Sequence, residues 1–308
     1  MITISIPTHN RPKLLKKAIT SILNQTYKDF KLVILDNASS PSTLNVVNDF
    51  DDIRISYFRS EINSIKFINE GFKQNKRKYL MIMHDDDTLS KFFLQNQISI
   101  LEKNNKISAI GSSVNLIDER DKELNKIRPF IFKDKVFSRY RFINEFLLRG
   151  DIIPCPTVIY RSSFVKKYNI EFPQNVGPAA DLYLFFKMNL LDTTIYLSKS
   201  ALYNYRVHDN QDSELNRVNL ELEIRPHIFK LLKKNNLISL SKKYKKASAA
   251  FIFHLIVLRF ITKKLDYVNF KKIYHLIRND GFSINFYSVY WSLFLILRII
   301  KHKLRMKI

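Results

Sequence analysis

Glycine is scarce in this sequence. Only five glycines occur among 308 residues, and neither a Walker P-loop nor a G-x-G-x-x-G turn can be written anywhere along the chain. Both motifs use glycine to bring backbone N–H groups close to phosphates. A nucleotide bound by this protein must therefore be held by another device.

Cysteine is almost absent as well. Cys155 is the only one, which excludes an intrachain disulfide and a metal site built from several thiolates. The N-terminal stretch MITISIPTHN has neither the basic region nor the long apolar region of a secretory signal. We therefore expect the protein in the cytoplasm, a reducing compartment.

Acidic residues are rare in the last quarter of the chain. Residues 225–308 contain 19 Lys and Arg but only two acids, Asp266 and Asp280, which gives a net charge of +17. The rest of the chain carries only +6 of the total of +23. This local excess of cations predicts a basic surface that binds an anionic partner, either phospholipid or nucleic acid.

The first hundred residues alternate β-branched runs with amphipathic segments. This βαβα order predicts an α/β fold with a parallel sheet. The predicted strands are Ile2–Ile6, Lys31–Leu35, Arg54–Phe58 and Tyr79–Met83. The predicted helices are Pro12–Gln25, Ser42–Phe50 and Ile65–Gln74.

From about residue 107 the pattern is mixed. Strands are predicted for ISAIGSSVNLID, PCPTVIY, TIYL and ALYNYRV, and helices for Tyr140–Arg149, RSSFVKKY and Ala179–Leu191. Beyond Glu214 the pattern is helical to the end of the chain.

Polar groups follow all four predicted N-terminal strands. They are Pro7-Thr8-His9-Asn10-Arg11, Asp36-Asn37, Glu61-Ile62-Asn63 and His84-Asp85-Asp86-Asp87. Ligands of open α/β sheets bind at the carboxyl ends of the strands, so four such clusters predict a site. Three adjacent carboxylates repel one another unless a cation lies among them, which favours a divalent metal. A solvated turn with an N-capping Asp is the alternative.

The stretch SIPTHNRPKLLKKAITSILNQTYKDFKLVILDNASS closely resembles the N-terminal signature of family 2 glycosyltransferases. These are inverting enzymes with a GT-A fold that use nucleotide-sugar donors. The resemblance implies a Rossmann-like, mostly parallel sheet flanked by helices, followed by a helical C-terminal region. It implies three parts: residues 1–112 bind the nucleotide-sugar, residues 113–213 bind the acceptor and hold the catalytic base, and residues 214–308 form a basic, aromatic helical region.

Position by position, the resemblance implies a donor site. Its implied nucleotide-sugar-binding residues are Pro7, Thr8, His9, Asn10, Arg11, Asp36, Asn63, His84 and Asp85. Asp36 would accept the ring N–H of uracil or thymine, and its alternative role is to cap the following helix.

The tetrad His84–Asp87 stands in the place of the D-x-D motif of the family. In one register His84 occupies the first position and Asp86 binds the metal. In the other register the pair is Asp85 and Asp87. The implied cofactor is Mn²⁺ or Mg²⁺, held by Asp86 or Asp87, and Mn²⁺ is favoured if a histidine takes part.

Two later residues complete the implied site. Asp181 matches the second member of an acidic pair in the family, although Ala180 replaces the first, and the resemblance implies that Asp181 is the catalytic base. Its alternative role is a helix N-terminal charge that interacts with the helix dipole. The run YRVHDNQDS resembles a late Y-R-x-H segment, which places His208 near the metal or the diphosphate. A surface loop histidine is the alternative.

Two apolar segments lie within the basic C-terminal region. Ala249–Ile261 is apolar nearly all round, which predicts a buried helix or a membrane-contacting surface. Gly281–Leu297 has 17 residues without a charge, slightly fewer than the ~20 that span a bilayer. Its aromatic residues beside Lys and Arg favour an interfacial helix on anionic lipid. A single membrane span and a soluble packing or dimer helix are the alternatives.

Together these features predict a metal-dependent inverting glycosyltransferase. It would move a sugar from a UDP-sugar, or a dTDP-sugar, to a glycan or lipid-linked glycan acceptor at the cytoplasmic face of the bacterial inner membrane. The pathway would make a surface polysaccharide such as O-antigen, capsule or lipopolysaccharide core. The alternatives are a metal-dependent phosphohydrolase and a nucleic-acid-binding protein. No nucleic-acid-binding motif occurs in the sequence, so no nucleic acid partner is expected.

Overall fold

The computed structural model describes residues 1–62, 64–73, 75–149, 153–176, 179–208, 217–261 and 266–279. The chain forms two compact units. The first consists of Met1–Phe142, Ile152–Gln174 and Met188–Gln211. The second consists of Ile143–Asp151, Asn175–Lys187 and Asp212–Ile308.

The first unit is built on a sheet in the order β3-β2-β1-β4-β9-β6-β10-β5, with β7 paired to β6 and β8 to β10. The strands are β1 (Ile2–Thr8), β2 (Phe30–Asn37), β3 (Ile55–Ser60), β4 (Tyr79–Ile82), β5 (Thr88–Leu89), β6 (Ile107–Ile117), β7 (Glu123–Arg128), β8 (Lys135–Phe137), β9 (Ile159–Arg161) and β10 (Thr194–Arg206). Strands β3, β2, β1 and β4 are mutually parallel, as the βαβα pattern predicts. The pair β6 and β10 is parallel too, while β9 runs antiparallel between β4 and β6.

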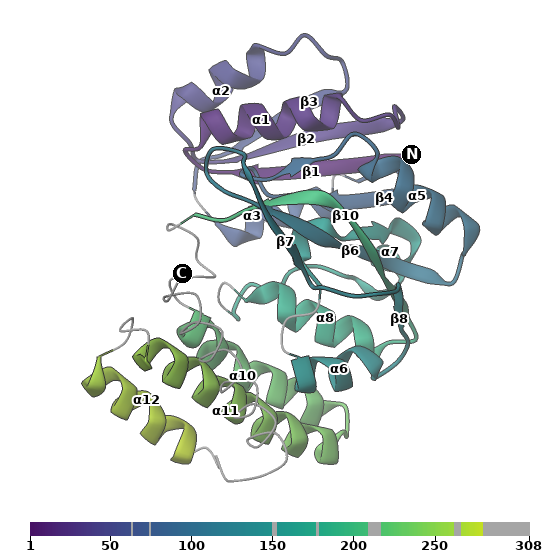
Figure 1. Cartoon of the computed structure of the whole chain (residues 1–308). Coiled ribbons are helices and arrows are strands. Elements are labelled where there is room, and N and C mark those ends of the chain that lie inside the picture. Colours follow the sequence, from purple (N-terminus) through teal and green to yellow (C-terminus); the bar gives the residue numbers. More distant parts are fainter. Residues whose placement is uncertain are drawn as a thin grey trace. The chain divides into compact units, whose positions relative to one another are not determined.

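The helices of this unit are α1 (Pro12–Leu23), α2 (Pro41–Asn48), α3 (Ile65–Ile68), α4 (Glu70–Lys73), α5 (Phe93–Lys103) and α7 (Ser162–Tyr168). Helix α1 begins at a proline, which suits the first turn because that position needs no N–H donor. Its buried face packs on alternate residues of β1, and Figure 1 shows α1 lying along β1 and β2. The buried residues are Leu15, Ala18, Ile19 and Ile22 from α1 with Ile2, Ile4 and Ile6 from β1. Each large side chain in this layer contributes about 1.5–3 kcal/mol of hydrophobic stabilisation.

The prediction of a single helix over Ile65–Gln74 is wrong. The segment is split into α3 and α4, with Asn69 between them. Asn69 is buried and uses its side-chain amide on the backbone of Phe172, accepting from its N–H and donating to its carbonyl at 2.9 Å each. Gly71 then brings α4 close to the sheet, since a Cβ there would lie 2.7 Å from Ile82 Cδ1.

Two other predicted boundaries change. The segment PCPTVIY begins with a 3₁₀ turn at Cys155–Thr157, flanked and occupied by prolines, so β9 starts only at Ile159. The segments TIYL and ALYNYRV form one strand, β10, whose pairing with β6 shifts register between Ser198 and Tyr203.

The remaining helices are α6 (Arg141–Arg149), α8 (Ala180–Leu190), α10 (Arg217–Lys234), α11 (Ile238–Ile261) and α12 (Tyr267–Asn279). The predicted apolar helix Ala249–Ile261 is the second half of α11. It forms a small core with α12 through Ala249, Ala250, Phe251, Ile252, Leu255, Ile256 and Ile277. None of the helices in the described ranges has the length and hydropathy of a membrane span. The segment Gly281–Leu297 lies outside the described residues.

Candidate active site

The acidic cluster forms a loop, residues 84–87, between β4 and β5. Its three aspartates are buried, with Asp85, Asp86 and Asp87 only 5%, 6% and 0% exposed. Strand β4 is apolar and fully buried, so it leads the chain directly into the interior at this point. Burying a carboxylate is costly unless it is paired and hydrogen-bonded. The partners of each aspartate therefore define the site.

Asp85 is bound from the end of β1. Thr8 Oγ1 donates to Asp85 Oδ2 at 2.7 Å, and Arg11 Nη1 donates to Asp85 Oδ1 at 3.2 Å. Burial and the negative charge of Asp86 nevertheless raise the pKa of Asp85, and Arg11 and Thr8 only partly offset this. The first and fourth predicted clusters thus meet at one edge of the sheet.

Asp86 lies between the guanidinium of Arg11 and the imidazole of His208. Its Oδ2 atom is 3.0 Å from Arg11 Nη1 and 3.2 Å from His208 Nε2. Burial opposes ionisation of Asp86, but His84, His208 and Arg11 together outweigh it and lower its pKa. His208 therefore is not an isolated loop residue.

Asp87 has structural partners for both carboxylate oxygens. Tyr203 donates its hydroxyl to Oδ2 at 2.8 Å, and the backbone N–H of Arg206 donates to Oδ1 at 2.8 Å. Complete burial and repulsion by Asp86 raise the pKa of Asp87 well above its ordinary value. These contacts attach the acidic loop to β10.

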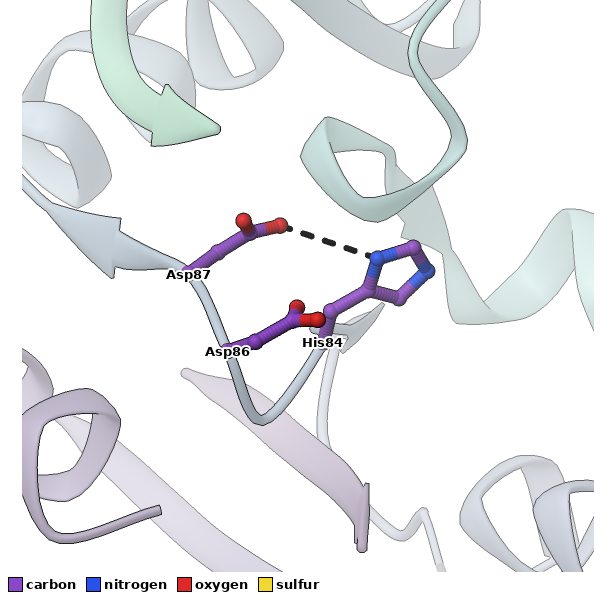
Figure 2. Close-up of side chains that lie close together, drawn as sticks. All are labelled: His84, Asp86 and Asp87. Atoms are coloured by element: carbon purple, nitrogen blue, oxygen red, sulfur yellow. Dashed lines mark ion pairs between the residues drawn. The ribbon is translucent and has the colours of Figure 1, made fainter. Parts of the chain in front are cut away.

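His84, Asp86 and Asp87 could together hold a cation. One ligand atom from each lies within 4.8 Å of the others. Figure 2 shows the three side chains extending from the loop toward one another, with His84 Nδ1 3.6 Å from Asp87 Oδ2. Carboxylate oxygens with an imidazole nitrogen suit Mn²⁺, and the oxygens alone suit Mg²⁺.

Arg206 is a residue that the sequence analysis missed. Its side chain is 1% exposed and donates to three acceptors: the Asp86 carbonyl at 2.7 Å, the Asp118 carbonyl at 2.8 Å and Asp121 Oδ1 at 2.5 Å. Arg206 therefore fixes the backbone of the acidic loop against the β6–β7 turn. Its place in the run YRVH, two residues before His208, was the available signal.

Asp36 is fixed at the end of β2. It is 1% exposed, its Oδ1 atom accepts the Ser39 N–H at 2.8 Å, and its Oδ2 atom accepts the Tyr57 hydroxyl. Helix α2 has Ser40 at its N-cap position, so Asp36 does not cap that helix. Tyr57 is a second residue that the sequence analysis missed.

His9 and Asn10 join the ends of β1 and β2. His9 Nδ1 lies 2.8 Å from the Asn37 carbonyl and Nε2 lies 3.1 Å from Asn10 Nδ2, so Nδ1 donates and Nε2 accepts. Asn10 adopts a left-handed backbone conformation with φ of 55°, which asparagine tolerates better than most residues. Its Oδ1 atom accepts the Ser40 N–H at 2.8 Å.

The other predicted site residues are placed separately. Pro7 lies within β1 beside Leu35 of β2. Asn63 lies outside the described residues. Asp181 lies in the first turn of α8, in the second unit, where its Oδ1 atom accepts the Leu182 N–H at 2.8 Å. The role of Asp181 as a base stays a prediction.

Comparison with known proteins decides the family. Residues 3–166 match the profile described as Glycosyl transferase family 2. The chain belongs to this family. This glycosyltransferase is 26% identical over 228 residues to an uncharacterized glycosyltransferase of Methanocaldococcus jannaschii, covering 71% of this chain and 74% of that protein. It is 29% identical over 234 residues to the GalNAc(5)-diNAcBac-PP-undecaprenol beta-1,3-glucosyltransferase of Campylobacter jejuni, covering 69% and 66% of the two chains.

Solved structures share the fold. The TarS 1–349 structure from S. aureus in complex with UDP-GlcNAc superposes with a TM-score of 0.60 at 16% identity, covering 92% of this chain and 93% of that one. The mannosyltransferase PcManGT from Pyrobaculum calidifontis, in complex with GDP-Man and Mn²⁺, superposes with a TM-score of 0.56 at 12% identity, covering 96% and 86%. The predicted GT-A fold class and the predicted glycosyltransferase activity are thereby confirmed.

Proposed function

We propose that this family 2 glycosyltransferase is metal-dependent and inverting, and that it uses a UDP-sugar, or a dTDP-sugar, as donor. The observation that carries the proposal is the buried acidic loop 84–87 at the carboxyl end of β4, where Arg11 and His208 converge on Asp86. A cluster of this kind neutralises the charge of a diphosphate through a bound cation. Such a cation would hold the phosphates in place of a glycine-rich loop, which this sequence lacks.

We assign metal binding first to Asp86, with His84 at the first position of the D-x-D motif. This register is supported by the hydrogen bonds of Asp87, whose two oxygens already accept from Tyr203 and Arg206. Asp87, through a lone pair that its two hydrogen bonds leave open, and His208 complete the proposed ligand set. A bound Mn²⁺ or Mg²⁺ supplies Lewis-acid stabilisation of the charge on the leaving diphosphate.

The donor nucleotide is proposed to bind along the ends of β1 and β2. Asp36 would accept the N–H of uracil or thymine, because its position is fixed by Ser39 and Tyr57 while each oxygen keeps a further lone pair. Cytosine would present the wrong edge to this acceptor. The remaining proposed contacts come from Pro7, Thr8, His9, Asn10, Arg11, Asn63, His84 and Asp85.

Asp181 is proposed as the general base. As the acceptor hydroxyl oxygen forms its bond to the anomeric carbon, Asp181 takes the hydroxyl proton, and the bond from that carbon to the diphosphate oxygen breaks on the opposite face. The electron pair leaves with the nucleoside diphosphate, and the configuration inverts. Base assistance of this kind is typically worth about 10²–10⁴-fold in rate.

The acceptor is proposed to be a glycan or a lipid-linked glycan of a bacterial surface polysaccharide. Support comes from the Campylobacter jejuni relative, whose name describes an undecaprenol-linked acceptor. The basic region 214–308 is proposed to contact anionic lipid at the cytoplasmic face of the inner membrane, because its cations greatly outnumber its acids. No nucleic acid partner is proposed.

A thermal-shift screen tests the proposal. UDP, dTDP, CDP and GDP are each added with Mn²⁺, with Mg²⁺ and with a chelator. We expect UDP or dTDP to raise the Tm only when a metal is present, because a ligand stabilises the state that it binds. Stabilisation that persists in chelator would contradict the metal dependence, and equal stabilisation by all four nucleotides would contradict the role of Asp36.

A further inference from the structure

The segment that joins β7 to β8 is attached to the sheet at both ends. At its start, the buried Ser113 on β6 donates its hydroxyl to the Pro129 carbonyl at 2.8 Å. At its end, Asp134 accepts the Lys199 N–H at 2.8 Å and also the Tyr196 hydroxyl. Residues 130–133, here called the aromatic tip, therefore protrude from two fixed points.

The aromatic tip exposes two phenylalanines. Phe130 is 65% exposed and Phe132 is 86% exposed, and their rings contact each other edge to face at a centroid distance of 5.0 Å. Ile127 and Val136 on the flanking strands are 43% and 42% exposed. Single exposed apolar residues are ordinary, but two exposed phenylalanine rings in contact, with further exposed apolar residues on the adjoining strands, favour an interaction site.

Cationic residues flank this apolar group along the chain. Lys126, Arg128 and Lys133 are all exposed. Over residues 122–139 the chain contains six Lys and Arg against two acids, a net charge of +4. Aromatic side chains flanked by Lys and Arg fit the interface of an anionic bilayer, because the rings enter the acyl boundary while the cations contact the headgroups.

A second copy of this chain is a weaker candidate for the occupant. Four side chains cover far less than the ~800 Å² per partner of a standard interface. A self-complementary contact would also bring equal positive charges face to face. Charge complementarity therefore favours lipid.

We propose that the aromatic tip is a second membrane-docking surface, which inserts Phe130 and Phe132 at the surface of an anionic bilayer. It belongs to the first unit and is separate along the chain from the basic region 214–308. The inference therefore goes beyond the proposed function, and a vesicle-binding experiment can succeed or fail independently of any transfer activity.

Vesicle co-sedimentation of the full chain tests the inference. The variant Phe130→Ser/Phe132→Ser should bind phosphatidylcholine–phosphatidylglycerol vesicles about tenfold or more weakly than the parent, since binding scales with inserted apolar area. The variant Lys126→Gln/Lys133→Gln should lose about 25-fold at low salt, about fivefold for each cation. The charge variant should show no comparable loss on vesicles of phosphatidylcholine alone.

The matched control is Phe92→Ser. Phe92 is 50% exposed and has the Lys91 ammonium 4.9 Å from its ring, but it does not lie on the tip. The control should bind vesicles like the parent, and each variant should keep the parent Tm. An unchanged partition coefficient for Phe130→Ser/Phe132→Ser would overturn the proposal.

Two further measurements separate the tip from other causes of binding. Trp291 is the only tryptophan, so the variant Phe132→Trp/Trp291→Phe reports on the tip alone. Its fluorescence should shift to the blue when phosphatidylglycerol vesicles are added, and an unshifted spectrum would contradict insertion. A parent dimer in light scattering that Phe130→Ser/Phe132→Ser converts to a monomer would overturn the assignment to lipid.

Discussion

The charged side chains of the acidic loop 84–87 and of helix α11 differ in burial and in pairing. The three aspartates of the loop are almost fully buried, and each has at least one polar partner from a distant part of the chain. Lys242, Lys243 and Lys246 of α11 are exposed, and among the described residues none of them pairs with a carboxylate. Buried charge is fixed by its partners, whereas exposed charge of one sign stays available to an external ligand.

This difference separates two kinds of effect. Removing a buried, partnered charge changes the geometry of the site and costs about 3–5 kcal/mol when it leaves an uncompensated charge. Removing an exposed charge changes stability by less than about 0.5 kcal/mol. The following substitutions test whether buried charges determine the activity and stability of the enzyme while exposed charges determine only its binding to an external ligand.

The largest effect is expected for Asp181→Asn. Asp181 is an acid in the unit that also contains the basic helices, and its proposed task is to accept a proton rather than to hold a cation. An amide cannot accept that proton, so kcat should fall about 10²–10⁴-fold. Donor-dependent thermal stabilisation should be retained. A variant with unchanged kcat would leave Asp181 with only a helix-dipole role.

Asp86→Asn should come next. Replacing the carboxylate that lies between Arg11 and His208 removes a proposed metal ligand, and activity should fall about 100-fold or more. The Mn²⁺-dependent part of the Tm shift should disappear. The control is Asp49→Asn, which removes an exposed acid paired with Lys16 at 2.8 Å. A metal-dependent shift that survives in Asp86→Asn would argue for the Asp85 and Asp87 register.

Arg206→Lys tests whether Arg206 positions the acidic loop that holds the proposed metal ligands. A lysine has one ammonium group and cannot replace the three contacts that Arg206 makes. Affinity for Mn²⁺ should fall about tenfold, and saturating Mn²⁺ should restore most of kcat. A loss of kcat that excess metal does not recover would indicate a role other than positioning the loop. The control is Arg54→Lys.

Lys243→Gln tests the contribution of an exposed charge on α11. Its unfolding free energy should change by less than about 0.5 kcal/mol. Binding to phosphatidylglycerol vesicles should weaken about fivefold at low salt and less at high salt. Salt-independent binding would show that charge on α11 does not contribute to membrane contact.

The smallest effect is expected for Asp52→Asn. Hydrogen bonds from Arg54 lower the pKa of Asp52 from 3.8 to about 2. Because the folded pKa lies below the unfolded one, the pair stabilises the fold above pH 3.8, and this stabilisation is lost as the pH falls toward about 2. The Tm of Asp52→Asn should therefore fall less steeply than that of the parent over this range. Equal slopes would show that the pair contributes nothing measurable.

The sequence predicted the parallel part of the sheet and the meeting of its strand ends. Local patterns sufficed, since β-branched runs define β1 to β4 and polar residues follow each of them. Asp85 and Arg11 were expected at one edge and lie 3.2 Å apart. The resemblance to family 2 supplied His208, which lies beside Asp86.

Long-range partners could not be predicted in this way. Tyr203 and Arg206 follow the acidic loop by more than 110 residues, and their contacts with it depend on β10 entering the sheet between β6 and β5. The partner of Asn69 is equally remote, because its side chain bonds the backbone of Phe172, which is 103 residues away. Such contacts have no local periodicity to detect.

The contacts of Arg206 continue outward to the surface. Asp121, which binds Arg206, also pairs with Lys17 on the half-exposed side of α1. Asp121 therefore supplies the counter-charge of a buried guanidinium through one oxygen and of a half-exposed ammonium through the other.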